Sequence, residues 1–136
     1  MNSNRKAALI TGASRGIGKG IAYALAKRGY DIAITYSDHS SDAEAVSKDI
    51  KELYGRECII FQASLEDPKI PAEIVKKTID HYQRLDVLVN NAGVTIFEEI
   101  LDLNIATIDK LYSLDFRAYL LSMHVAASHM IKEKIK

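Results

Sequence analysis

Short apolar runs and helical patterns alternate along this chain. Residues 7–11 (AALIT) form a continuous apolar run that ends at Gly12, and residues 31–36 (DIAITY), 58–63 (CIIFQA) and 87–89 (VLV) are three further runs of this kind. Short continuous apolar runs bounded by turn residues are typical of strands that are buried on both faces. The pattern therefore predicts four short strands.

The intervals between these runs have hydrophobic residues at helical spacing. Residues 16–28 are the first expected helix, and residues 41–53 are the second, which begins with the capping-box sequence Ser41-Asp-Ala-Glu44. A third helix is expected from Pro71, which suits a first helical turn, to about Tyr82. The pattern is helical again from about Thr107 to the end of the chain.

Strands that alternate with helices of this length imply βαβ units. We therefore expect an α/β fold, a doubly wound (Rossmann) parallel sheet of about four strands with helices on both faces. Residues 1–136 form one dinucleotide-binding domain in this interpretation. In such sheets the ligand crevice lies beyond the carboxyl ends of the strands. Small or polar residues stand at all four expected strand ends, namely Thr11-Gly12, Tyr36-Ser37, Ser64-Leu65 and Asn90-Asn91.

Composition narrows the class of protein but not its activity. The 136 residues are 48% hydrophobic and 26% charged with a formal net charge of zero, so bulk charge predicts neither nucleic-acid nor membrane-surface binding. The apolar run before Gly12 is too short for a signal peptide or a membrane span. Cys58 lies in an apolar run, where we interpret it as a small buried hydrophobe, and a single cysteine fits a reducing, cytoplasmic setting.

Histidine spacing does not predict a metal site. His124 and His129 are five residues apart and do not share a helix face, and no cysteine or carboxylate stands at ligand spacing. His39 lies in a polar loop and His81 near a helix end. We interpret all four as surface or packing residues.

The strongest candidate for chemistry is a glycine loop. Gly12, Gly16 and Gly18 form Gly-x-x-x-Gly-x-Gly between an expected strand and an expected helix. Without side chains, this backbone can approach an anionic pyrophosphate, and the helix N-terminus adds partial positive charge and free N–H donors. The strand–turn–helix context makes the motif a strong prediction of a dinucleotide site.

The segment Thr11-Gly-Ala-Ser-Arg-Gly-Ile-Gly18, together with Asn90-Asn-Ala-Gly93, resembles the short-chain dehydrogenase/reductase family. The resemblance covers essentially the whole chain, and 3-oxoacyl-acyl-carrier-protein reductases are among the most similar members. It implies an oxidoreductase that uses a nicotinamide cofactor on a small-molecule carbonyl/alcohol pair, and a homo-oligomer. The residues expected to bind the cofactor are Gly12, Ser14, Arg15, Gly16, Ile17, Gly18, Ser37, Ser64, Leu65, Asn91, Ala92 and Gly93.

The second strand end bears on the choice of cofactor. An acidic residue there holds the ribose 2′-hydroxyl of NAD, whereas basic groups accept the 2′-phosphate of NADP. Tyr36 matches the acidic position, Ser37 follows it, and Arg15 can grip a phosphate with two charge-assisted hydrogen bonds. We therefore expect NADP(H) rather than NAD(H). Asp38 leaves the alternative open, because a small backbone shift would bring its carboxylate to the ribose.

The catalytic groups of the family do not match residues of this chain. The resemblance implies a Ser, a Tyr and a Lys after a fifth strand, and the chain ends at Lys136 before that strand. Tyr23 and Lys27 have the required spacing, but they lie in the helix after the glycine loop, and we interpret the match as accidental. Asp115 stands where the family has a relay Asn, which replaces a neutral amide with a carboxylate.

Three hypotheses remain open from the sequence. The chain is the cofactor-binding part of a reductase, a nucleotide-binding fragment without turnover, or a piece that is stable only in association with another chain. We expect the 136 residues alone to associate or to be poorly soluble, and not to reduce carbonyls.

Overall fold

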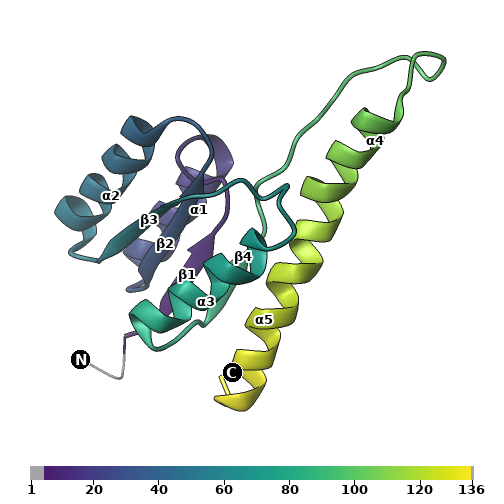
Figure 1. Ribbon diagram of the computed structural model, residues 1–136. Coiled ribbons are helices and arrows are strands. Elements are labelled where there is room, and N and C mark those ends of the chain that lie inside the picture. The colour runs from purple at the N-terminus through teal and green to yellow at the C-terminus, as the bar shows by residue number, and fades with distance from the viewer. Residues whose placement is uncertain (1–4, 136) are drawn as a thin grey trace.

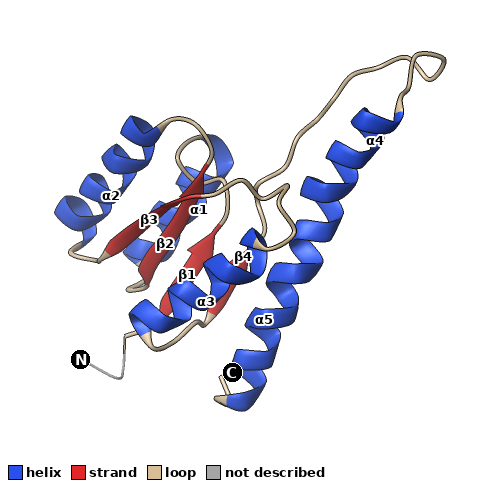
Figure 2. Cartoon of the chain, viewed as in Figure 1, coloured by secondary structure: helices blue, strands red, loops and turns tan. Residues whose placement is uncertain are grey.

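The computed structural model describes residues 5–135 and contains one four-stranded parallel sheet (Figures 1 and 2). The strands are β1 (Ala7–Ile10), β2 (Asp31–Tyr36), β3 (Cys58–Gln62) and β4 (Val87–Val89), in the spatial order β3-β2-β1-β4. All three strand pairs are parallel. The expected doubly wound α/β sheet is therefore confirmed. Residues 1–4 and Lys136, which end the expected domain, lie outside the described part of the chain.

Helices cover both faces of the sheet. The helices are α1 (Gly16–Lys27), α2 (Ser40–Tyr54), α3 (Ile70–Tyr82), α4 (Ile105–Tyr112) and α5 (Ala118–Lys132), with a π-helical turn, η1 (Ser113–Arg117), between the last two. In Figure 1, α4, η1 and α5 form one long continuous helical rod. None of the helices in residues 5–135 is long and apolar enough to cross a bilayer.

Alternation along β1 divides the core into two layers. Ala8 and Ile10 pack with the buried residues of α1 and α2, whereas Leu9 packs with those of α3 and α5. All three side chains are fully buried. Successive side chains of a strand point to opposite faces, so a strand covered on both sides must be apolar throughout. This is why AALI reads as a continuous hydrophobic run.

Two helix starts differ from the sequence expectation. Helix α2 begins at Ser40 with His39 as its N-cap residue and has no side-chain capping bond, so the predicted capping box at Ser41 was wrong. Helix α4 begins at Ile105, two residues before the expected start, because the Asn104 side chain accepts a hydrogen bond from the Thr107 amide at 3.1 Å.

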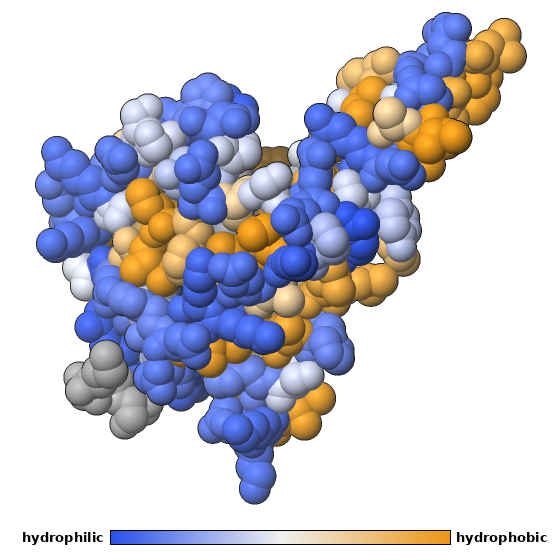
Figure 3. Space-filling model, viewed as in Figure 1, coloured by the Kyte–Doolittle hydropathy of each residue, from blue (hydrophilic) through white to orange (hydrophobic). Residues whose placement is uncertain are grey.

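The segment between β4 and α4 is an extended arm, which we define as residues 94–104. It runs outward from the sheet end to the top of α4 (Figure 1). Phe97 and Leu101 on the arm are each 94% exposed, and the space-filling view shows apolar surface there and along the adjacent helix (Figure 3). Within the described chain, the large apolar side chains near the tip of the arm are therefore uncovered.

Candidate nucleotide site

The glycine loop joins β1 to α1 at the carboxyl end of the sheet. Gly12 and Gly16 have φ values of 63° and 59°, a left-handed conformation that strongly favours glycine. A Cβ on Gly12 would lie 2.9 Å from Ala92 Cα, and one on Gly18 would lie 2.6 Å from the Gly12 carbonyl oxygen. The loop conformation and the close approach of backbone to backbone therefore both require glycine.

A threonine at the end of β1 connects this loop to the segment after β4. Thr11 Oγ1 accepts hydrogen bonds from the backbone amides of Asn91 and Ala92, each at 3.0 Å. In return, the Asn91 side-chain amide donates to the carbonyl oxygens of Thr11 at 2.9 Å and Gly12 at 3.0 Å. Thr11 and Asn91 thus hold the two loops together at the sheet end.

Thr35 has a similar role at the end of β2. Its hydroxyl oxygen accepts a hydrogen bond from the Gly12 amide, and its carbonyl oxygen accepts one from the Ala13 amide, both at 3.0 Å. The side chain is buried, with 1% exposure. Thr35 was not among the predicted residues, although a hydroxyl residue near the end of a buried strand is a signal for such a contact.

These loops surround a cleft of about 580 Å³ at the carboxyl ends of the strands. Most of the predicted cofactor residues line it, namely Gly12, Ser14, Arg15, Ser37, Ser64, Leu65, Asn91, Ala92 and Gly93. Gly16, Ile17 and Gly18 do not line it and form the first turn of α1 beside it, where the Ile17 side chain is 79% exposed. The sequence prediction thus identified residues from four separate loops that the fold brings to one place.

Several residues that line the cleft were not predicted from the sequence. His39 is exposed, as expected of a surface residue, and it also lines the cleft from the start of α2. The other lining residues that were not singled out are Thr35, Ala63, Glu66, Val94, Lys110 and Leu114. Lys110 and Leu114 come from the last helices, and only the tertiary fold places them near the strand ends.

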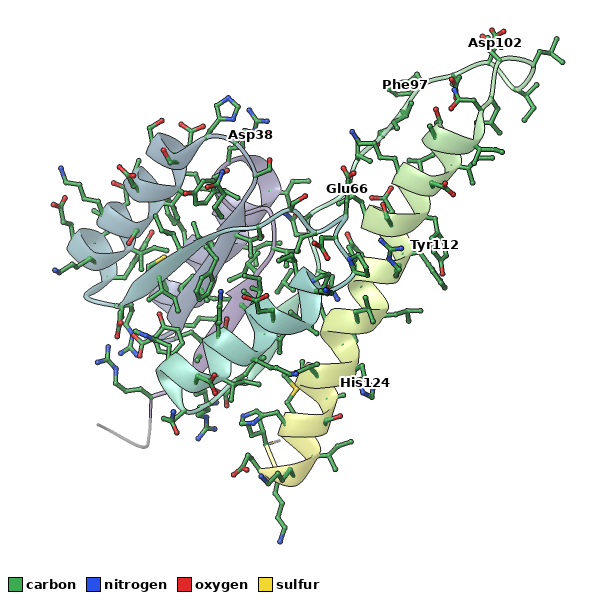
Figure 4. All side chains as sticks on the ribbon, in the orientation of Figure 1. Asp38, Glu66, Phe97, Asp102, Tyr112 and His124 are labelled. Atoms are coloured by element: carbon green, nitrogen blue, oxygen red, sulfur yellow. The ribbon has the colours of Figure 1, made fainter. Side chains whose placement is uncertain are left out.

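Charged groups of both signs line the cleft. Arg15 and Asp38 both line the cleft and are exposed, and Ser37 Oγ donates to Asp38 Oδ2 at 3.0 Å. In Figure 4, Asp38 is labelled at the loop between β2 and α2, and Glu66 lies beside the long helical rod. Lys110 Nζ is 3.8 Å from Glu66 Oε1, so these two charges neutralise each other.

Asp115 lies in the π-helical turn and contacts the loop after β4. Its Oδ1 accepts a hydrogen bond from the Val94 amide at 2.9 Å, and a Cβ on Gly93 would lie 2.9 Å from the same oxygen. Tyr119 Oη donates to the Ala92 carbonyl oxygen at 2.9 Å. Burial, and next the charge of Asp115, raise the pKa of Tyr119. Asp115 and Tyr119 therefore fix the backbone that lines one side of the cleft.

Tyr23 and Lys27 do not line the cleft. Tyr23 Oη donates to Asp49 Oδ2 at 2.5 Å, and its ring lies near Tyr54 of α2. Desolvation, followed by the hydrogen bond to Asp49, raises the pKa of Tyr23. This tyrosine links α1 to α2, and its geometry does not suit proton transfer in the cleft.

Metal binding and thiol chemistry have little structural support. Among residues 5–135, no group of three or more His, Cys, Asp or Glu side chains could hold a metal ion. Cys58 is partly buried on β3, and burial raises the pKa of its thiol to about 12. A thiol of this kind is a poor nucleophile because almost none of it is thiolate at neutral pH.

Sequence comparison relates the chain to known oxidoreductases. Residues 6–135 match the family model described as short chain dehydrogenase. The short-chain dehydrogenase/reductase FrzI of Cladobotryum sp is 38% identical over 125 residues, which are 92% of this chain and 48% of FrzI. The 3-oxoacyl-[acyl-carrier-protein] reductase FabG of Staphylococcus aureus (strain N315) is 44% identical over 90 residues, 66% of this chain and 36% of FabG.

A solved structure supports the same relationship. The short chain dehydrogenase from Burkholderia cenocepacia J2315 in complex with NADP has a TM-score of 0.88 and 40% identity, over 93% of this chain and 52% of that one. The chain spans between about a third and a half of the length of the relatives that it matches. The family match, the parallel sheet and the glycine loop agree, and the chain belongs to the short-chain dehydrogenase/reductase family.

Proposed function

We propose that this chain is the NADP(H)-binding part of an oxidoreductase that acts on a carbonyl/alcohol pair of a small molecule. The observation that carries the proposal is the cleft at the strand ends, where the glycine loop and Arg15 meet the loops after β2, β3 and β4. The complex of the Burkholderia cenocepacia relative with NADP supports the choice of cofactor.

The residues of the cleft fit a nicotinamide dinucleotide. The Gly12 loop leaves no room for a Cβ, and α1 presents its N-terminus beside it, so pyrophosphate would lie against free backbone amides. Arg15 and Ser37 would hold a ribose 2′-phosphate. Ser64 and Leu65 would lie at the adenine, and the backbone of residues 91–93 at the nicotinamide ribose.

Hydride transfer to or from carbon is the chemistry that a nicotinamide cofactor supplies when bound. The residues of this chain would bind and orient the dinucleotide. The positive charge of Arg15 would lie beside the ribose 2′-phosphate. The hydrogen bonds between Thr11 and Asn91 would keep the glycine loop and the loop after β4 at a fixed separation. Asp115 and Tyr119 would hold the segment at the nicotinamide end.

The second candidate function is cofactor binding without turnover. Tyr23–Lys27 is the only Tyr-x-x-x-Lys sequence in the chain, and it lies on α1 outside the cleft. We therefore expect these 136 residues alone to bind NADPH and not to reduce a carbonyl compound. Steady oxidation of NADPH with a β-ketoester by the purified chain would contradict this expectation. It would mean that another residue of the chain donates the proton to the carbonyl oxygen.

Titration with NADPH and NADH, followed by nucleotide fluorescence, tests the proposal. We expect NADPH to bind about tenfold more tightly than NADH, because a 2′-phosphate adds charge-assisted hydrogen bonds. Arg15→Ala should remove most of this preference and leave NADH binding unchanged. Arg28→Ala is the matched control, since Arg28 is exposed at the opposite end of α1 and does not line the cleft. Tighter binding of NADH by the unmodified chain would overturn the assignment of NADP(H).

The exposed apolar residues of the last helices support self-association. Ile108, Tyr112, Phe116 and Leu120 are each about half exposed, and they recur every four residues along the helical rod. Such a stripe typically packs against another protein surface. We propose a homo-oligomer that uses this stripe, and light scattering coupled to gel filtration would detect it. A monomer at micromolar concentration would contradict the proposal.

A further inference from the structure

The helical rod formed by α4, η1 and α5 contains one turn that departs from α-helical geometry. In η1 the Ala118 amide donates to the Ser113 carbonyl oxygen, five residues earlier in the chain. The Ser113 amide itself still donates to the Asp109 carbonyl oxygen, four residues earlier, as in an α-helix. Single π-helical turns inside α-helices frequently lie at functional sites. The turn thus contains one residue more than an α-helical turn, and regular helix precedes and follows it.

The burial of α4 and α5 shows the effect of this extra residue. An α-helix has 3.6 residues per turn, so two residues 18 positions apart in an uninterrupted α-helix lie on the same face, about five turns apart. Ile108 is half exposed, whereas Ala126 is 2% exposed and belongs to the core cluster that includes residues of α3. Tyr112 is also half exposed, whereas Met130 packs against that cluster. Both pairs are 18 positions apart, so the faces of α4 and α5 do not follow one α-helical register.

One register describes the whole rod when Asp115 is left out of the count. The exposed row consists of Ile108, Tyr112, Phe116 and Leu120, and the buried row consists of Ala118, Ser122 and Ala126. At about 100° per residue, the exposed row then lies within about 60° of the circumference, and the buried row lies on the opposite side. With Asp115 included, the exposed row would spread over about 120°. Figure 4 agrees with the first count, since Tyr112 and His124 both point away from the sheet.

Asp115, the residue outside this register, contacts the loop after β4. Its Oδ1 accepts a hydrogen bond from the Val94 amide at 2.9 Å, and a Cβ on Gly93 would lie 2.9 Å from the same oxygen. The residue is exposed, so burial of apolar surface does not account for this contact. Gly93 and Val94 both line the cleft. The extra residue of the turn is therefore the one that binds the backbone at the edge of the cleft.

We infer that η1 is a one-residue insertion that makes Asp115 a positioning residue for the loop after β4. The insertion brings a carboxylate to the Val94 amide while α4 and α5 keep common exposed and buried faces. Asp115 consequently takes no position from the exposed row or from the buried row. Its effect on nucleotide binding rests on the proposed function, whereas the geometry of the turn does not.

Two single-residue deletions in the rod test the insertion. Asp115 and His124 are both exposed, so neither deletion removes a buried side chain. Deletion of Asp115 should convert η1 into regular α-helix and leave both rows aligned. Deletion of His124 should rotate the rest of α5 by about 100° and move Ala126 and Met130 away from the core. We therefore expect the His124 deletion to unfold at a clearly lower urea concentration than the Asp115 deletion. Equal unfolding midpoints would overturn the inference.

Hydrogen exchange and nucleotide titration test the role of Asp115 at the cleft. In the Asp115 deletion we expect the Val94 amide to exchange at least about tenfold faster, which corresponds to the loss of one hydrogen bond. NADP⁺ should bind several-fold more weakly to this variant, because the loop after β4 is no longer fixed. Asp115→Asn retains an acceptor oxygen and should keep the exchange rate and the affinity of the unmodified chain. Unchanged exchange of the Val94 amide in the deletion variant would show that Asp115 does not position the loop.

The unmodified chain provides a measurement that does not depend on the folding of a variant. Nuclear magnetic resonance detects scalar coupling across a hydrogen bond, and the Ala118 nitrogen should couple to the Ser113 carbonyl carbon. Coupling to the Leu114 carbonyl carbon instead would show an uninterrupted α-helix and overturn the inference. If the unmodified chain binds no nucleotide but the coupling, exchange and unfolding results are as expected, the proposed function fails and the positioning role of Asp115 stands. If NADP⁺ binds equally to the unmodified chain and to the Asp115 deletion, the positioning role fails and the proposed function stands.

Discussion

The sheet with α1–α3 and the segment of residues 94–135 use hydrophobic residues in opposite ways. In the first region, Leu9, Ile32 and Ile34 are fully buried between two layers of helices. In the second, Phe97 and Leu101 are 94% exposed, and the buried residues are small ones on η1 and α5, namely Ser113, Ala118, Ser122 and Ala126. Apolar composition alone therefore does not distinguish a buried core from an exposed surface.

The two regions meet at the cleft through a few polar contacts. The Val94 amide donates a hydrogen bond to Asp115 Oδ1 at 2.9 Å, and Tyr119 Oη donates one to the Ala92 carbonyl oxygen at the same distance. Arg117 donates to the Glu66 carbonyl oxygen at 2.6 Å. The first region thus provides most of the buried core, and the second contributes to one side of the cleft. Substitutions matched by residue type can measure this difference.

The largest expected difference is between two leucines. Leu9→Ala removes a fully buried side chain and should lower the free energy of unfolding by about 2–5 kcal/mol, because the lost apolar contact leaves a cavity. Leu101→Ala, on the arm, should change it by less than about 0.5 kcal/mol. Urea unfolding followed by circular dichroism measures both. A similar loss in both variants would mean that Leu101 is covered in solution, and would remove the contrast between the regions.

The next expected effect concerns a polar link inside the first region. Thr11→Val keeps the shape of the side chain but removes the oxygen that accepts from the Asn91 and Ala92 amides. Unpaired N–H groups in a partly buried site cost about 1–3 kcal/mol. We therefore expect the free energy of unfolding to fall by about 2 kcal/mol and NADP⁺ to bind more weakly. Thr95→Val on the arm is the control, since Thr95 is exposed, and it should change neither quantity. Unaltered nucleotide affinity in Thr11→Val would show that the link does not shape the cleft.

The part of this site that the sequence predicts is the part that depends on local patterns. The glycine loop follows a buried run and precedes a helix, so its position at a strand end is evident without coordinates. The roles of Thr35, Lys110 and Leu114 depend on contacts between elements far apart in the chain, which no local pattern encodes. Resemblance aligned Asp115 with the relay Asn of the family, but its bond to Val94 is visible only in the structure.

Helix starts illustrate the same limit at close range. The sequence Ser41-Asp-Ala-Glu44 favours a capping box, yet the helix begins one residue earlier, at Ser40. Helix α4 begins before its expected position because Asn104 caps it. Helix ends vary by one or two residues, so a short capping pattern alone does not determine the first residue of a helix. His39 consequently occupies the N-cap position and lines the cleft rather than lying in a free loop.

A smaller effect is expected where the second region contacts the cleft. Asp115→Ala removes the acceptor of the Val94 amide and should lower the free energy of unfolding by about 1 kcal/mol, since the residue is exposed and water replaces part of the bond. Asp115→Asn retains an acceptor oxygen, so its free energy of unfolding should fall much less. Hydrogen exchange of the Val94 amide gives the local measurement, and we expect faster exchange only in Asp115→Ala. Equal exchange in the two variants would mean that the side chain does not hold this loop.

The smallest expected effect is at the exposed ion pair between the regions. Lys110 Nζ and Glu66 Oε1 are 3.8 Å apart, and both side chains are about half exposed. Exposed pairs of this kind contribute about 0–1 kcal/mol and are screened by salt. Glu66→Gln should therefore change the free energy of unfolding by less than about 0.5 kcal/mol in 0.15 M salt, and the difference should vanish in 1 M salt. The Arg117 contact to the Glu66 backbone remains in this variant, so it isolates the charge of the side chain. A loss above about 1 kcal/mol that persists in 1 M salt would mean that this pair, and not the Asp115 and Tyr119 contacts, holds the helical rod against the sheet.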